Sequence, residues 1–197
     1  MTLFTVPVFP RVSLLDTRSW FDLVQGTYVR TSTILDRLPI GQLQRVAGGI
    51  FFDGEYSYSE FQQQGLILHE FDYWWDYVLP SVSLGARQLL PEVTASLIMK
   101  VLELSRQLYR KAGYFGLIEF SFAADGLAGA FFSRGGRTWL RDPPKLVESE
   151  INITRRFSMG ELEENLLAIS KHCQRDIYWA FGFDAPEQWL EEEFNFA

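Results

Sequence analysis

Two Asp-Gly dipeptides place the strongest constraint on how this chain folds. Asp53–Gly54 and Asp125–Gly126 each stand between segments of alternating or apolar residues. Asp-Gly is a preferred two-residue turn between antiparallel strands, because both turn positions take a positive φ. The sequence therefore predicts an antiparallel meander over residues 50–72 and a second hairpin over residues 116–132.

Strand side chains in the first segment alternate between two faces. Tyr58 and Glu60 share one face of the predicted strand, and Ser59 points to the other. Residues 3–8 predict a further short strand. Pro7 favours an edge position for it, because proline has no N–H to donate to a neighbouring strand.

Two segments predict long helices. Residues 92–111 follow Pro91, which suits the first helical position, and carry an apolar stripe at Leu97, Val101, Leu104 and Leu108. The second helix begins after Ser158, which fits a capping box with Glu161. Its apolar stripe runs to Ile177, and Gly182 ends it.

The order of these elements is strands, helix, hairpin, helix. That order favours an α+β fold, in which two long helices pack on a mostly antiparallel sheet built from hairpins. We expect a single domain over residues 1–197. Residues 11–47 carry no decisive pattern, and residues 186–197 fit either a helical turn or a strand.

Composition limits the class of protein. The chain is 47% hydrophobic and has 31 aromatic residues (17 Phe, 8 Tyr and 6 Trp), so it can build a large core without a metal or a disulfide. Cys173 is the only cysteine, and the N-terminus lacks the pattern of a signal peptide. We expect a soluble cytoplasmic protein with no cofactor and no membrane partner. The net charge of −7 disfavours, without excluding, a nucleic-acid partner.

Residues Tyr56–Leu68 and the helix ending Trp179–Gly182 resemble the C-terminal region of a family of bacterial proteins. The N-terminal part of those proteins is a Schlafen-like, AlbA-type DNA-binding domain, often labelled ATP-binding. The resemblance covers residues 48–185. It does not include the family's N-terminal domain, with its Gly-Gly-Thr signature. It implies a companion module for regulation, sensing or assembly, and it implies no catalytic residue.

The stretch HEFDYWWDY, residues 69–77, is the densest group of chemically active side chains. A metal-dependent hydrolase using His69, Asp72 and His172 is one hypothesis. Strand alternation argues against it, because on a strand Glu70 and Asp72 share the face opposite His69 and cannot converge with it unless the strand bends. We therefore expect His69 to be a hydrogen-bonding residue at a strand end.

Other catalytic signatures are weak. Cys173 lies on the apolar stripe of the last helix, which predicts a buried and inert thiol. The chain contains neither a Gly-x-Ser-x-Gly nucleophile motif nor a Gly-rich phosphate loop. We predict no catalytic residue and no metal ligand.

One basic segment stands out in the acidic chain. Its candidate residues for binding nucleic acid or another anion are Arg134, Arg137, Trp139, Arg141, Arg155 and Arg156, and Lys145 lies among them. Arginines that contact phosphates beside an aromatic ring that stacks on a base would suit a nucleic acid. A solvated face that docks an acidic protein is the other interpretation.

Aromatic side chains supply the candidates for a protein partner: Trp74, Trp75, Trp189, Phe194 and Phe196. Each is an interaction residue if it is exposed and a core residue if it is buried. The preferred function is a non-catalytic regulatory or protein-interaction domain that self-associates or joins a larger assembly. A nucleic-acid or nucleotide-binding accessory protein and a metal-dependent hydrolase are the alternatives.

Overall fold

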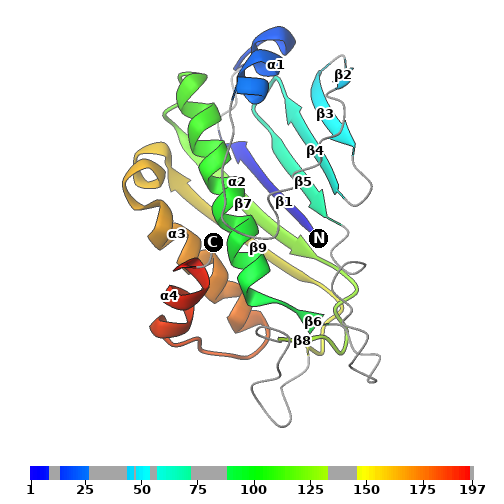
Figure 1. Ribbon diagram of the computed structural model, residues 1–197, viewed down its shortest axis with the longest axis vertical. Helices are drawn as coiled ribbons and strands as arrows, with labels where there is room; N and C mark the ends of the chain where they lie inside the picture. Colours follow the sequence, from blue (N-terminus) through cyan, green and yellow to red (C-terminus); the bar gives the residue numbers. More distant parts are fainter. Residues whose placement is uncertain are drawn as a thin grey trace.

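The computed structural model describes residues 1–8, 14–26, 44–46, 48–53, 57–71, 88–132 and 146–195. Its helices are α1 (Thr17–Gly26), α2 (Pro91–Lys111), α3 (Met159–Ala180) and α4 (Glu187–Asn195). Its strands are β1 (Thr2–Pro7), β2 (Gln44–Val46), β3 (Gly49–Asp53), β4 (Ser57–Gln62), β5 (Ile67–Phe71), β6 (Gln88–Leu89), β7 (Leu117–Ala124), β8 (Phe131–Phe132) and β9 (Ile151–Ser158). The fold is α+β, as the sequence predicts (Figure 1).

Seven of the described strands form one sheet in the order β2-β3-β4-β5-β1-β7-β9, and each neighbouring pair is antiparallel. The prediction that β1 is an edge strand is wrong, because β1 lies between β5 and β7. Pro7 is tolerated there because it is the last residue of β1. Pairing with β5 covers only Thr2–Thr5, and Pro7 lies opposite Ile118 of β7.

The first predicted meander is confirmed, since β3 pairs with β4 and β4 with β5. The second predicted hairpin is wrong. Residues after Gly126 do not return along β7: the Leu127 N–H donates to Ser149 O at 2.9 Å, and β8 pairs in parallel with β6. The antiparallel partner of β7 is β9, which follows later in the chain.

The helices lie on one side of the sheet (Figure 1). α1 contacts β3, α2 contacts β1, and α3 contacts β9. The predicted stripe of α2 is buried throughout. The sheet residues that share the helix-bearing face are buried as well: Leu3, Thr5, Ile50, Phe61, Ile67, Ile118, Phe120 and Phe122. Each such apolar side chain contributes about 1.5–3 kcal/mol by leaving water. None of the helices in the described part of the chain combines the length and hydrophobicity needed to cross a membrane.

The capping box predicted for α3 is confirmed. Ser158 Oγ accepts from the Glu161 N–H at 3.1 Å, and the Glu161 carboxylate accepts from the Ser158 N–H at 2.6 Å. Gly182 follows the helix with a φ of 77°. One feature was not predicted: Asn165 has non-helical angles (φ −131°, ψ 31°), so α3 is kinked one to two turns after it begins.

Buried hydroxyl groups join α2 to the centre of the sheet. The Tyr109 hydroxyl donates to Gly65 O at 2.7 Å and lies 3.1 Å from Thr5 Oγ1. Ser105 Oγ lies 2.7 Å from Thr5 Oγ1 and donates to Val101 O at 2.6 Å. This group fixes α2 against β1 and against the turn between β4 and β5.

Replacing Tyr109 by Phe tests this connection. Because the variant leaves Gly65 O buried without its donor, the free energy of unfolding should fall by about 1–3 kcal/mol in urea titrations. The control is Tyr58→Phe, whose hydroxyl is only part-buried and bonds Glu60, and its loss should stay below about 1 kcal/mol. Equal stability of Tyr109→Phe and the wild type would show that the network does not stabilise the fold.

Candidate functional site

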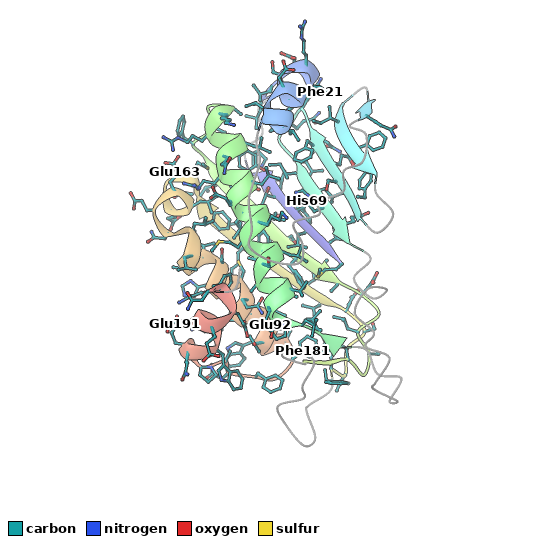
Figure 2. All side chains as sticks on the ribbon, viewed as in Figure 1. Phe21, His69, Glu92, Glu163, Phe181 and Glu191 are labelled. Carbon is teal, nitrogen blue, oxygen red and sulfur yellow. The ribbon has the colours of Figure 1, made fainter. Side chains whose placement is uncertain are left out.

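His69 is a buried residue on the helix-bearing face of the sheet (Figure 2). Its Nδ1 lies 2.8 Å from Ser59 Oγ, and the ring of Phe61 meets it edge-on at 5.8 Å. Burial, and next the charge of Lys100, lower the pKa of His69 to about 4. The imidazole is therefore neutral near pH 7, and it serves as a hydrogen-bonding core residue within β5.

The two histidines of the hydrolase hypothesis are not brought together. His172 is exposed on α3, whereas His69 is buried beside the sheet, and Asp72 lies outside the described residues. Glu70 is exposed on the opposite face from His69, as strand alternation predicts. Among the described residues, no three His, Cys, Asp or Glu side chains are placed to hold a metal ion.

Cys173 is buried on α3, on the side predicted from the apolar stripe. Burial, with a smaller effect of the Asp176 carboxylate, raises the pKa of the thiol to about 12. The thiol is therefore protonated at neutral pH and is a poor nucleophile.

Arg155 and Arg156 do not form a common basic surface. Successive strand residues point to opposite faces, so Arg155 lies on the helix side of β9 and Arg156 on the other side. Arg155 bonds both oxygens of Asp176 at 2.6 Å, and Arg156 bonds Glu119 at 2.8 Å. Arg134, Arg137, Trp139, Arg141 and Lys145 lie outside the described residues, and their role stays a prediction.

The predicted partner residues near the C-terminus lie within the fold. Residues 187–195 form α4, in which Phe194 is buried and Trp189 is partly buried beside Tyr178, with ring centroids 6.3 Å apart. Phe194 is thus a core residue rather than an exposed contact. Trp74, Trp75 and Phe196 lie outside the described residues.

A buried carboxylate that sequence reasoning missed attaches α4 to the other helices. Glu193 accepts hydrogen bonds from the Tyr178 hydroxyl and from Gln174 Nε2, the latter at 3.4 Å. Gln174 in turn accepts from Thr94 of α2 at 3.0 Å. Glu193 stands three residues after the buried Leu190, and residues three apart lie on the same face of a helix. This spacing was a signal in the sequence that Glu193 is buried.

A surface hollow of about 350 Å³ lies between α3 and the start of α4. Lys171, His172 and Arg175 line it, but Lys171 and Arg175 already form ion pairs with Glu187. Its carboxylate lies 3.0 Å from Lys171 Nζ and 2.5 Å from Arg175. The charges of Lys171 and Arg175 are therefore paired within the chain, so neither residue indicates a binding site for an anionic ligand.

The sheet face away from the helices carries a different set of side chains. Phe4, Val6, Phe51, Tyr58 and Leu68 are partly exposed there, and we call them the open-face patch. Leu68 lies directly opposite Phe4 on the neighbouring strand, and the rings of Phe51 and Tyr58 lie 5.9 Å apart. No helix of the described stretches covers this patch (Figure 1).

Charged residues lie within and beside the open-face patch. Glu60 stands between Phe51 and Leu68 in the strand register, and it accepts from Tyr58 at 3.0 Å and from Gln62 at 2.8 Å. Glu70 is exposed on β5, and Arg156 lies at the β9 end of the same face, with 65% of its side chain exposed. The face is therefore a mixture of apolar and charged side chains.

His69 makes a specific prediction about pH. Its pKa is about 4 in the folded chain and 6.5 ordinarily, so between these values the unfolded chain binds the extra proton. Stability should fall as pH drops from 6.5 to 4, by about 3 kcal/mol at most. His69→Asn, which keeps a hydrogen-bonding group beside Ser59, should remove this part of the pH dependence of urea unfolding.

His172→Asn is the control, since it removes a histidine from an exposed position. A wild-type pH dependence in His69→Asn would contradict the assignment.

In comparisons with known proteins, no family model, no curated protein and no solved structure matches this chain significantly. The resemblance to proteins with a Schlafen-like AlbA-type domain therefore stays a prediction. The functional conclusion rests on the geometry of the described residues.

Proposed function

We propose that this chain is a non-catalytic protein-interaction domain and that the open face of its sheet is the docking surface. The observation that carries the proposal is the open-face patch itself. A two-layer fold that buries one face of its sheet under helices leaves the other face to water or to a partner. Apolar side chains on that second face gain free energy only if a partner covers them.

The state of the titratable groups supports a binding function over a catalytic one. His69 and Lys100 are buried with 2% and 4% exposure, and Glu193 is fully buried. Arg155 and Arg156 each have a carboxylate partner. In the described part of the chain the first three groups are shielded from solvent, and the two arginines are held by carboxylates, so none of these groups is both accessible and unpaired.

The open face also has the composition of a binding surface. Its aromatic and aliphatic side chains lie among the charged residues Glu60, Glu70, Glu119 and Arg156. Aromatic side chains beside polar and charged ones are common in protein interfaces. The companion-module role implied by the resemblance to Schlafen-like AlbA-type proteins agrees with this proposal.

Hydroxyl-radical footprinting of dilute protein tests whether the face is open. At about 1 µM, where weak complexes dissociate, Phe4 and Tyr58 should be oxidised several times faster than Phe61 and Phe120 on the helix side. Phe4 is chemically matched to Phe61 and Phe120 and differs from them in the face it occupies, whereas the rate of Tyr58 is compared after correction for the intrinsic reactivity of tyrosine. Oxidation of Phe4 and Tyr58 as slow as that of Phe61 and Phe120 would contradict the proposal, because the chain itself would then cover the patch.

Adjacent residues of β5 provide a second test. Leu68→Glu places a charge on the open face and should change the free energy of unfolding by no more than about 1 kcal/mol. Ile67→Glu places the same charge in the core and should cost more than about 4 kcal/mol or prevent folding. Equal destabilisation by both variants would mean that Leu68 belongs to a core.

A further inference from the structure

We propose that the partner on the open face is an amphipathic helix of another protein, with an apolar stripe and with lysine or arginine on both flanks of that stripe. This inference rests on the proposed function, since it names the kind of partner that the same surface takes. Two observations carry it. Apolar side chains of the face follow one diagonal line, and the carboxylates beside one end of that line form no ion pair within the described part of the chain.

The strand register places the diagonal line across the middle of the sheet. It begins at Tyr58 on β4 and passes Leu68 on β5 and Val6 on β1, all of them partly exposed. It ends at Leu117 on β7, which extends the open-face patch and is 39% exposed. Each step along the line moves one strand across the sheet and two residues along it, so every member stays on the open face.

The dimensions of the diagonal line are those of one helix. Strands lie about 4.8 Å apart and two strand residues span about 7 Å, so one step is about 8 Å and the whole line is about 25 Å. A helix of about 16 residues has this length, and its diameter of about 10 Å covers the line together with Phe4 beside it. Exposed Asn152 and Thr154 lie on the same face beyond that width. A flat sheet laid on the face would bury them, whereas a helix leaves them in water.

Two carboxylates flank the diagonal line where it passes from Tyr58 to Leu68. Glu60 lies on one side and Glu70 on the other, because Glu60 pairs with Leu68 and Glu70 pairs with Tyr58 across the two strands. Glu60 accepts hydrogen bonds from the neutral side chains of Tyr58 and Gln62, and neither carboxylate forms an ion pair with a cation of the described residues. A helix seated on the line meets a carboxylate on each side, and cations on both of its flanks would be complementary to them.

Fluorescence anisotropy of a dye-labelled synthetic peptide tests this class of partner. The peptide has about 16 residues, with leucine at helical i, i+3, i+4 and i+7 spacing and lysine on both flanks. It should bind the full chain with a dissociation constant on the order of 10 µM in about 0.15 M salt, since a contact of this size belongs to weak, transient complexes. The same peptide with glutamate in place of lysine should bind at least about tenfold more weakly.

Leu68→Glu separates docking on the line from general attraction between a cationic peptide and an acidic chain. The substitution makes the chain more acidic, so general attraction would tighten binding. Docking on the line should instead weaken by about 10-fold or more, because the interface loses a leucine. Leu167→Glu, at an exposed leucine of α3 on the helix side, adds the same charge and is the matched control. It should change the affinity by less than about twofold.

Glu70→Lys tests the charged flank without changing the apolar line. It should weaken binding of the lysine peptide by about 3- to 10-fold, because it sets a cation against the lysines of the peptide. Glu164→Lys changes the net charge equally at an exposed position of α3, and it should change the affinity by less than about twofold. Both positions are exposed, so this comparison stays valid if Leu68→Glu does not fold.

Equal affinity for the lysine and glutamate peptides would overturn the inference, as would tighter binding of the lysine peptide to Leu68→Glu. Equal effects of Glu70→Lys and Glu164→Lys would overturn it too. If Phe4 and Tyr58 of the dilute protein are oxidised quickly and the lysine peptide does not bind, the cationic helix is excluded while the docking function remains. If they are oxidised slowly, the docking function fails as well.

Discussion

The one-sided placement of the helices on the sheet is the constraint on which the rest of the structure depends. Because strand side chains alternate, β1 sends Leu3 and Thr5 into the core and Phe4 and Val6 to the other face. The same division continues through β5, where His69 is buried and Leu68 is not. One face is thus covered by helices, and in the described part of the chain no helix covers the other.

Buried polar groups determine where the helices sit on that covered face. Thr5, Ser105 and Tyr109 place α2 over β1, and Glu193 with Gln174 and Tyr178 attaches α4 to α3. Apolar packing alone tolerates sliding, whereas a buried hydroxyl or carboxylate that loses its partner costs the full desolvation of that group. The sequence patterns single out none of these groups, yet in the structure they hold elements together.

Local patterns in the sequence predicted the helices and several strands. They did not predict which strands far apart in the chain pair with each other. The helix stripes, the Ser158–Glu161 capping box and the β3–β4–β5 meander depend on residues close in the chain, and all are confirmed. The central place of β1 and the pairing of β7 with β9 depend on contacts between distant segments, for which a turn signal such as Asp125–Gly126 gives no information. Lys100 and Glu193 were missed because the apolar stripes were traced from apolar residues alone, although the helical spacing places both on buried faces.

The central proposal is that the helix-free face of the described sheet is a docking surface. Adjacent residues of β5 test it directly, because Leu68 lies on that face and Ile67 is buried on the helix side. With a water-soluble paramagnetic agent added to dilute protein, the account predicts strong relaxation of the Leu68 methyl groups and little relaxation of the Ile67 methyl groups. Leu68 methyl groups as protected as those of Ile67 would contradict it.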